Sequence, residues 1–470
     1  MRVWEDLEPK RVFFHFENLC RVPHGSGNTK AASDYCMAFA QEHGLWAHRD
    51  ELGDVVIRKA ASPGYESHAP IILQGHLDMV CEKEPGETID MAREGLRPAR
   101  DGDFVFARGT TLGGDDGIAV AMILSVLEDD SLAHPPIEAL FTVDEETGMY
   151  GAAALDPSLL KGRTLLNLDS EDEGVLTVGC AGGARAELCR KGQEEPLTQP
   201  AYEVVLGGLI GGHSGVEIDR GRYNANKLMG EFLASLSSDF SLVSLAGGEK
   251  DNAIPRECRA VVSCAVSPET AAAAFAAAHR NPNDPGLFLR VSPAKAERGL
   301  SFAESRQAVG LLCELPCGVQ EMSPDLPGLV QTSLNLGMLR LKDGELTATF
   351  SVRSSVGARK AALLEKLRAI GERFGAAYSD HGHYPAWEFR AESPLRDVMV
   401  AVYERLTGKK PEVVTIHAGL ECGLFAEKLP GLDAVSFGPE LLDIHTPRER
   451  LSISSTARTY AYLCQVIQSL

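Results

Sequence analysis

Several histidines and carboxylates of this sequence stand shortly after short apolar runs, and both residue types can bind metal ions. His76 follows the run PIILQG, Glu146 comes soon after IEALFTV, and Asp169 follows TLLNL. His445 lies just after AVSFGPELLDI, and Asp115 lies in the glycine-rich segment GTTLGGDDG. A mixture of imidazole and carboxylate ligands suits zinc, cobalt or manganese better than calcium or magnesium. The sequence therefore predicts a metal centre built from these residues.

This set is too large for a single catalytic zinc ion, which usually keeps three protein ligands and an open position. Two ions that share Asp115 as a bridge fit better, and ions roughly 3.5–4 Å apart can hold one hydroxide and polarise a carbonyl oxygen. This is the chemistry of peptide or amide hydrolysis. We expect Glu145, beside the ligating Glu146, to act as the general base. Asp78 lies two residues beyond His76 in an extended segment, so we expect it to orient the imidazole.

The fold must bring these residues together, because they lie far apart in the sequence. From about Pro70 to Asp169, apolar runs alternate with helical patterns such as GIAVAMILSVLED, which is typical of parallel strands joined by helices. The carboxyl ends of parallel strands face one edge of a sheet, where open α/β proteins place their sites. We therefore expect the residues that follow these strands to converge at one edge.

The region from about Ala201 to Tyr384 has a different pattern. Alternating strands such as CRAVVSCAVS and ELTATFSVRSS are followed by helical segments, which predicts an antiparallel sheet with helices on one face. After this region the first pattern returns. The expected fold is therefore α/β: a mostly parallel-sheet catalytic domain, residues 1–190 and 385–470, is interrupted by an α+β lid domain with an antiparallel sheet, residues 191–384.

Composition excludes several classes of function. The chain has 470 residues, and its 46 basic and 66 acidic residues give a net charge of −20, which disfavours nucleic acid as a partner. The beginning of the sequence lacks the pattern of a signal peptide, and no apolar stretch is long enough to span a bilayer. Eleven cysteines without the spacing of a disulfide framework suit a reducing cytoplasm. We expect a cytoplasmic protein without a membrane partner.

Two residues of the inserted domain are candidates for substrate binding. His213 lies in GGLIGGHSG, where flanking glycines free the backbone to present the imidazole, and we predict that it polarises the scissile carbonyl. Arg353 in TFSVRSS is predicted to bind a substrate carboxylate with two hydrogen bonds, although the sequence fits a surface arginine nearly as well.

The same motifs resemble a known family. LQGHLDMVCEK, RGTTLGGDDGIAVAM, FTVDEETGM, LLNLDSEDEG, GGHSGVEIDRGRYNANK and IHAGLECGLF together are similar to the aminoacyl-histidine dipeptidases, also called Xaa-His dipeptidase, peptidase D or cytosol non-specific dipeptidase. These enzymes belong to the aminoacylase and carboxypeptidase G superfamily of dinuclear zinc hydrolases. The matching motifs run in order along nearly the whole chain. One departure is Gly114, where the family motif is expected to have alanine.

The resemblance implies a division of the ligands between two ions. His76, Asp115 and Asp169 would hold one ion, and Asp115, Glu146 and His445 would hold the other. It also implies Glu145 as the base, Asp78 as the carboxylate behind His76, and His213 as the lid histidine. His417 and Glu421 would lie near the substrate. A non-proline cis peptide is implied after Asp115.

The expected activity is hydrolysis of free dipeptides, Xaa-His among them, by two divalent ions, with zinc expected and cobalt or manganese as alternatives. The expected partners are a small peptide substrate and, from the resemblance only, a second copy of the chain in a homodimer. Two other functions stay open at this point. One is an amidohydrolase that removes an acyl group from an N-acyl amino acid. The other is a non-catalytic metal-binding scaffold, which the presence of Glu145 disfavours.

Overall fold

The computed structural model describes residues 2–324 and 326–470, and they form two compact units. The first unit contains residues 2–179, 389–415 and 420–470, and the second contains residues 180–388 and 416–419. The first boundary lies before the expected residue 190, because strand β9 (Gly182–Lys191) pairs with strands of the second unit. Residues 416–419 join the second unit, where the amide of Ala181 donates to the carbonyl of Ile416 at 3.1 Å.

The first unit is built around a sheet of eight strands. The strands are β1 (Trp46–Arg49), β2 (Val55–Lys59), β3 (Ile71–His76), β6 (Ile137–Thr142), β7 (Thr164–Asn167), β8 (Val175–Cys180), β22 (Glu412–Ile416) and β23 (Asp433–Ser436). Their order across the sheet is β1-β2-β6-β3-β7-β23-β8-β22. The central strands β6, β3, β7 and β23 are parallel, whereas β2 and β8 pair antiparallel on either side of them. The sheet is therefore mixed, with a parallel centre.

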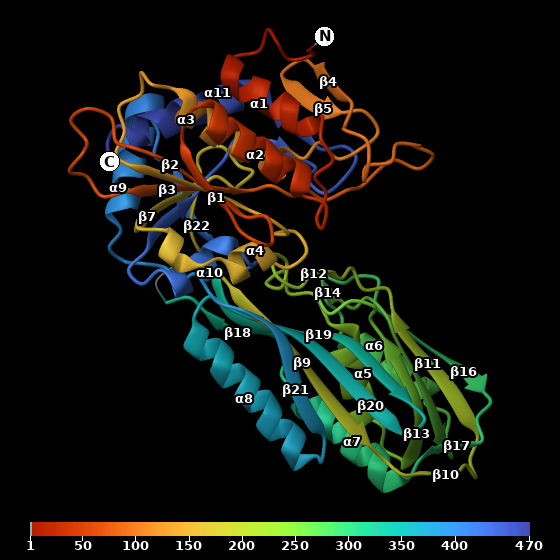
Figure 1. The fold of residues 1–470 in the computed structure, drawn as a ribbon. Helices are drawn as coiled ribbons and strands as arrows, with labels where there is room; N and C mark the ends of the chain where they lie inside the picture. The colour runs from red at the N-terminus through yellow and green to blue at the C-terminus, as the bar shows by residue number, and fades with distance from the viewer. Residues whose placement is uncertain (1, 325) are drawn as a thin grey trace. The chain divides into compact units, whose positions relative to one another are not determined.

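Helices and a small second sheet complete the first unit (Figure 1). The helices are α1 (Lys10–Cys20), α2 (Lys30–Glu42), α3 (Gly114–Glu128), α4 (Tyr150–Ala154), a 3₁₀ turn (Pro157–Leu159), α9 (Pro394–Thr407), α10 (Glu421–Lys428) and α11 (Ile453–Ile467). The small sheet has the order β24-β25-β5-β4, formed by Leu441–Leu442, Arg450–Ser452, Phe104–Ala107 and Pro98–Asp101. Helix α1 packs against α3, and α10 packs against α4.

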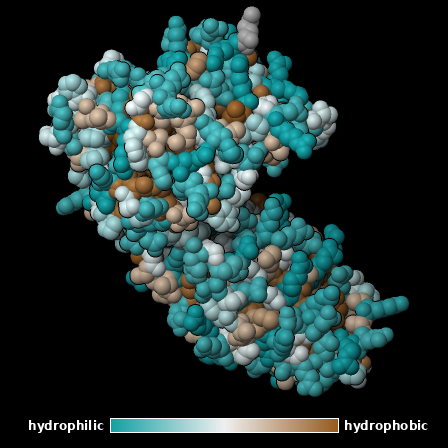
Figure 2. Space-filling view, in the orientation of Figure 1, coloured by the Kyte–Doolittle hydropathy of each residue, from teal (hydrophilic) through white to brown (hydrophobic). Residues whose placement is uncertain are grey.

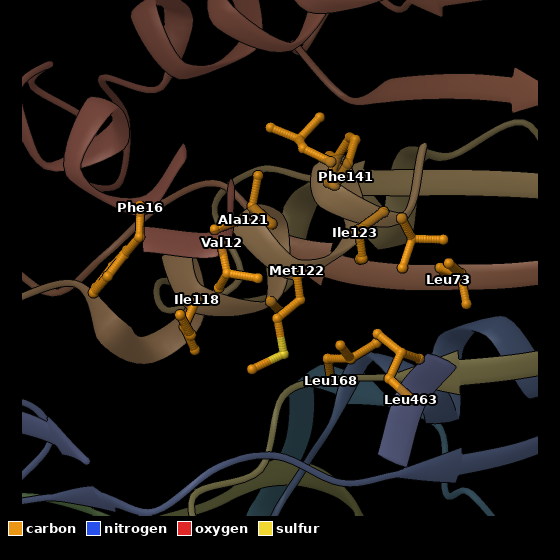
Figure 3. Packing of buried hydrophobic residues seen from close by; sticks show 14 of the residues in the cluster. Val12, Phe16, Leu73, Ile118, Ala121, Met122, Ile123, Phe141, Leu168 and Leu463 are labelled. Atoms are coloured by element: carbon orange, nitrogen blue, oxygen red, sulfur yellow. The ribbon is translucent and has the colours of Figure 1, made fainter. Parts of the chain in front are cut away.

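Helix α3 is apolar around its whole circumference, as expected of a helix with no face in water. Ile118, Met122 and Ile123 are fully buried, and Figure 3 shows them between Phe16 of α1 and Leu73 of β3. Each large apolar side chain buried in this way contributes roughly 1.5–3 kcal/mol. The core therefore holds the first turn of α3, which carries Asp115, against the strand that ends at His76.

The second unit contains a nine-stranded sheet in the order β16-β11-β15-β13-β19-β20-β9-β21, with β18 paired to β19. All its pairings are antiparallel, and the strands besides β9 are β11 (Ala201–Gly207), β13 (Phe240–Gly247), β15 (Cys258–Cys264), β16 (Phe288–Ala294), β18 (Gly318–Met322), β19 (Val330–Lys342), β20 (Glu345–Ser354) and β21 (Ala377–Tyr384). Short pairs are formed by β10 (Glu194–Pro196) with β17 (Arg298–Leu300), and by β12 (Gly212–His213) with β14 (Ala253–Ile254). The antiparallel sheet expected from the sequence is present.

Four helices pack with this sheet into one core: α5 (Ala225–Ala234), α6 (Glu269–Ala278), α7 (Phe302–Glu314) and α8 (Gly357–Arg373). Phe232 of α5, Leu312 of α7 and Leu367 of α8 are buried in it together with Phe350 of β20. The face seen in Figure 2 is mostly hydrophilic in both units, in keeping with the net charge of −20. Within the described residues, no helix combines the length and apolar character needed to cross a bilayer.

Candidate metal centre

The parallel centre of the first sheet delivers the predicted ligands to one edge. His76, the last residue of β3, is in register with Thr142, the last residue of β6, so the loop with Glu145 and Glu146 starts beside it. Strand β7 ends at Asn167, opposite Gln74, and Asp169 follows two residues later. The convergence expected from the sequence is therefore present, because parallel strands end on the same side.

Asp115 lies between two histidines that come from opposite ends of the sequence. Its Oδ1 is 3.1 Å from Nε2 of His76, and its Oδ2 is 3.1 Å from Nε2 of His445. His445 Nε2 is also 2.9 Å from Oε1 of Glu146, and His76 Nε2 is 3.9 Å from Oδ1 of Asp169. Two groups of ligand atoms therefore meet at Asp115, which is the arrangement that a bridging carboxylate needs.

A neighbouring carboxylate, Asp116, also lies within this cluster. Its atoms group with those of His76 and Asp169 closely enough to surround an ion, and its Oδ2 accepts a hydrogen bond from the amide of His76. The sequence analysis predicts Asp115 as the bridging ligand and gives Asp116 no role. Gly75 makes room for this contact, because a Cβ there would lie 2.7 Å from Oδ2 of Asp116. The peptide bond between Asp115 and Asp116 is cis, as the family resemblance implied.

The carboxylates of the cluster give it an excess of negative charge, which favours the binding of cations. Burial would lower the pKa of His76, but its hydrogen bonds to Asp115 and Asp78 raise it well above the ordinary value. Hydrogen bonds to Asp115 and Glu146 raise the pKa of His445 to about 10. The carboxylates thus draw a proton onto each imidazole, and divalent ions would satisfy the same excess of negative charge. Imidazole nitrogens with carboxylate oxygens are also a donor set that fits zinc-class ions.

Two loops of the centre contain residues in the left-handed region, which non-glycine residues rarely adopt. Asp144, just before Glu145, has φ of 55°, and His445 has φ of 58°. The carboxylate of Asp144 accepts a hydrogen bond from the amide of Gly27 at 2.6 Å. Such conformations persist only where surrounding contacts impose them, and they concentrate at functional sites.

Asp78 connects the predicted ligand His76 to the loop of the predicted base. Nδ1 of His76 lies 3.0 Å from the carbonyl oxygen of Asp78 and 3.4 Å from its carboxylate. The same carboxylate accepts hydrogen bonds from the amides of Glu145 and Glu146 at 3.0 and 3.3 Å, and from the hydroxyl of Ser26 at 2.7 Å. Asp78 therefore lies beside the imidazole of His76, and its orienting role stays a prediction. Burial, together with the charges of nearby carboxylates, raises the pKa of Glu145 to about 8.

Glu421 lies beneath the centre rather than on a surface. It is fully buried, and its Oε2 accepts hydrogen bonds from Nε2 of Gln74 at 2.6 Å and from the hydroxyl of Thr142 at 2.7 Å. Gln74 in turn accepts from the amide group of Asn167 at 2.5 Å. This network joins β3, β6 and β7 just before the residues that carry the chemistry. The contacts of Glu421 therefore indicate support of the site, and its contact with substrate stays a prediction.

The other predicted substrate residues belong to the second unit. Arg353 is 9% exposed, and its guanidinium donates to the hydroxyl of Tyr384 at 3.1 Å. Among the described residues no carboxylate forms an ion pair with it, and its Nε has no hydrogen-bond partner. His417 is 2.7 Å from the hydroxyl of Ser333, and burial together with Arg353 lowers the pKa of His417 to about 4. Burial and the charge of Arg353 also lower the pKa of His213.

Sequence reasoning missed two residues of the centre, Asp116 and Glu449. Asp116 was visible in the motif as the second of two adjacent aspartates, but its neighbour alone was assigned. Glu449 follows His445 by four residues, and its side chain reaches the backbone of the loop before α3. No local pattern in the sequence marks that contact, which joins residues more than 330 positions apart.

Comparisons with known proteins identify the family of this chain. The sequence profile of the peptidase family M20/M25/M40 matches residues 72–469. The cytosol non-specific dipeptidase of Escherichia coli (strain K12) is 35% identical over 476 residues, which cover 99% of this chain and 98% of that protein. The crystal structure of aminoacylhistidine dipeptidase from Vibrio alginolyticus has a TM-score of 0.94 and 34% identity, over 100% of this chain and 98% of that one.

A more distant structure shares the fold alone. Aminopeptidase PepT from Bacillus cereus has a TM-score of 0.58 and 15% identity, over 98% of each chain. The family profile covers most of this chain, and the Escherichia coli relative aligns with this chain over nearly the full length of both proteins. The resemblance seen in the motifs is thus confirmed, and the chain belongs to the peptidase family M20/M25/M40.

Proposed function

We propose that this protein is a dinuclear-metal dipeptidase. One observation carries the proposal: the two oxygens of Asp115 face two different histidines, each with a further carboxylate beside it. This arrangement supports His76, Asp115 and Asp169 as ligands of one ion, and Asp115, Glu146 and His445 as ligands of the other. Two ions bound there would acidify a water molecule and polarise the carbonyl of the scissile bond.

Glu145 is proposed to move the proton. Its amide is held by Asp78, and its carboxylate is adjacent in sequence to the proposed ligand Glu146. A carboxylate beside the attacking water can accept its proton as a general base and return it as a general acid. Glu145 can therefore take the proton of the attacking water and deliver it to the nitrogen of the leaving amine.

Arg353 supports a substrate with a free carboxylate. Burial of a guanidinium with only a neutral tyrosine as partner is costly, and a bound carboxylate would compensate for it. His213 is proposed to donate to the carbonyl oxygen of the substrate. The Escherichia coli relative is named as a non-specific dipeptidase and the Vibrio structure as an aminoacylhistidine dipeptidase, so we propose free dipeptides, Xaa-His among them.

Three finer points belong to the same proposal. Zinc is the proposed ion, because its preferred ligands are those present. The proposed compartment is the cytoplasm, in keeping with eleven cysteines whose spacing is not that of a disulfide framework and with a relative named as a cytosol enzyme. A homodimer whose second unit acts as a lid is proposed on the family resemblance.

The test is release of amino acids from free and N-acetylated dipeptides, Xaa-His members included, by enzyme stripped of metal and then restored with zinc, cobalt or manganese. Metal-dependent cleavage of free dipeptides alone supports the proposal. Turnover confined to acylated substrates indicates an amidohydrolase, and no turnover with any ion indicates a scaffold. Glu145→Gln should lower kcat by roughly 10²- to 10⁴-fold while metal content stays unchanged. Full activity in that variant would remove Glu145 from the mechanism.

A further inference from the structure

Glu449 accepts hydrogen bonds from four consecutive backbone amides. Its Oε2 lies 2.7 Å from the amide nitrogen of Leu112 and 3.1 Å from that of Gly113. Its Oε1 lies 2.7 Å from the amide nitrogen of Gly114 and 3.3 Å from that of Asp115. The Glu449 side chain is only 2% exposed, so water does not compete for these amides.

These amides belong to the segment that leads into α3, where backbone N–H groups have no partner within the helix. Asp115 and Asp116 have non-helical dihedral angles, so the segment is not held by regular helical hydrogen bonds. A carboxylate is an acceptor with two oxygens and about four lone-pair sites, and its hydrogen bonds to N–H groups are stronger than those of a neutral acceptor. Glu449 therefore supplies the contacts that hold the backbone of Asp115 in place.

The same residue lies on the loop of another proposed ligand. His445 precedes Glu449 by four residues, and the amide of Glu449 donates to the carbonyl of Thr446 at 3.0 Å, which closes the turn between them. One side chain thus joins the loop of Asp115 to the loop of His445. The distance between Asp115 Oδ2 and His445 Nε2, 3.1 Å, depends on how these two loops are held.

We propose that Glu449 is a positioning residue that sets the bridging carboxylate Asp115 against His445, and so determines how tightly the pair of ions is bound. The inference rests on the ligand set of the proposed function. Gly114 fits the same arrangement, because a Cβ there would lie 3.1 Å from Oε1 of Glu449 and 2.5 Å from Cδ2 of Leu441. The absence of a side chain at Gly114 therefore lets the backbone before α3 lie close to the carboxylate of Glu449.

The experiment measures binding of Co²⁺ to metal-free enzyme, by titration against a competing chelator and by the visible absorption of the bound ion. Glu449→Gln replaces one oxygen with an amide NH₂ group, which would face two backbone donors that it cannot accept from. We expect a roughly 10- to 100-fold loss of Co²⁺ affinity and an altered absorption spectrum. We also expect a lower kcat with little change in KM, because Glu449 positions ions and does not bind substrate.

Glu138 provides a matched control. It is 3% exposed and likewise accepts two backbone amides, those of Lys161 and Gly162 at 2.8 and 2.9 Å, but it lies near the start of β6, away from the ligands. Glu138→Gln should lower stability and leave the affinity and spectrum of Co²⁺ unchanged. A loss of affinity as large as that of Glu449→Gln would show that buried carboxylates affect the ions only through stability, and would overturn the inference.

The outcomes separate this inference from the proposed function. Wild-type enzyme that binds two Co²⁺ ions, together with a folded Glu449→Gln variant of unchanged affinity and spectrum, overturns the inference alone. Wild-type enzyme that does not bind two ions overturns both. If Glu449→Gln does not fold, Glu449→Asp is measured in the same way. It keeps the charge but is one methylene too short to reach all four amides, so it must show the same loss of affinity.

Discussion

Replacing Arg353 by methionine should reduce the activity of the enzyme without reducing its stability. Arg353 is 9% exposed, and among the described residues its guanidinium donates to the neutral hydroxyl of Tyr384. Removing a buried charge that lacks an opposite charge relieves a desolvation cost. We therefore expect the thermal midpoint of Arg353→Met to equal or exceed that of the wild-type enzyme.

The effect on activity follows from the lost contact with the substrate. A hydrogen bond to a charged group contributes about 1.5–3 kcal/mol, which corresponds to a roughly 10- to 150-fold decrease of kcat/KM. The assay compares a free dipeptide with the same dipeptide amidated at its carboxyl end. The wild-type enzyme should prefer the free dipeptide, and Arg353→Met should lose that preference.

Arg190 is the control for this substitution, because it is also a buried arginine of the second unit. It is 7% exposed, but it donates to Glu304 at 2.5 Å and to the carbonyl of Phe374 at 2.9 Å. Arg190→Met should destabilise the protein by about 1–3 kcal/mol, since Glu304 is partly exposed and recovers some solvation. Its kcat/KM should not change. If Arg353→Met keeps the preference for a free carboxylate, the assignment of Arg353 is wrong.

Three further predictions concern the free energy of unfolding at low pH, the role of His213 in the second unit, and the binding of the ions. Burial would raise the pKa of Glu128, but hydrogen bonds from His15 and Arg11 hold it at about 2, so its stabilisation is complete above the unfolded pKa of 4.5 and is lost as pH falls toward 2. In Glu128→Gln the free energy of unfolding should therefore fall by about 1–2 kcal/mol less between neutral and low pH than in the wild-type enzyme, a modest difference because Arg11 stays half in solvent. Urea unfolding between pH 3 and 7 measures this difference. An unchanged dependence of the unfolding free energy on pH would contradict a stabilising ion pair at Glu128. His213→Ala should lower kcat roughly 10²- to 10³-fold at unchanged metal affinity, and steady-state kinetics with wild-type kcat would exclude the role proposed for His213. Restoring ions to stripped enzyme at 1,000 times their Kd should stabilise the fold by about 4 kcal/mol for each ion bound, measured by calorimetry. An unchanged midpoint would mean that the ions do not bind the folded state.

The strands, and the histidines and carboxylates that follow them, could be predicted because both are local patterns. An apolar run such as IEALFT becomes β6, and the residues after it must leave the sheet at its carboxyl end. Helix α3 was equally evident, since an unbroken apolar run after Asp116 can only be buried. These features depend on side-chain types within a few residues, so a single sequence contains them. The family motifs then predict which polar residues take part in the chemistry.

The boundary between the units was misplaced for a physical reason. Strand β9 follows β8 directly and has a similar apolar character, so nothing local shows that β9 pairs with β20 and β21. Residues 416–419 join the second unit through a backbone hydrogen bond to Ala181, although their sequence neighbours belong to the first. Strand pairing is a choice among distant partners, and sequence periodicity does not specify the partner.

The sequence by itself predicts the chemistry available to this protein: five histidine and carboxylate residues as ligands, a glutamate as base, and strands that end just before these residues. Only the tertiary structure decided how they are held. It placed Asp116 beside His76, buried Glu421 under the ends of three strands, and brought Glu449 to the amides before α3. A residue type and its position can be read along the chain, but a hydrogen bond between a carboxylate and a backbone amide more than 330 residues away exists only after the chain has folded.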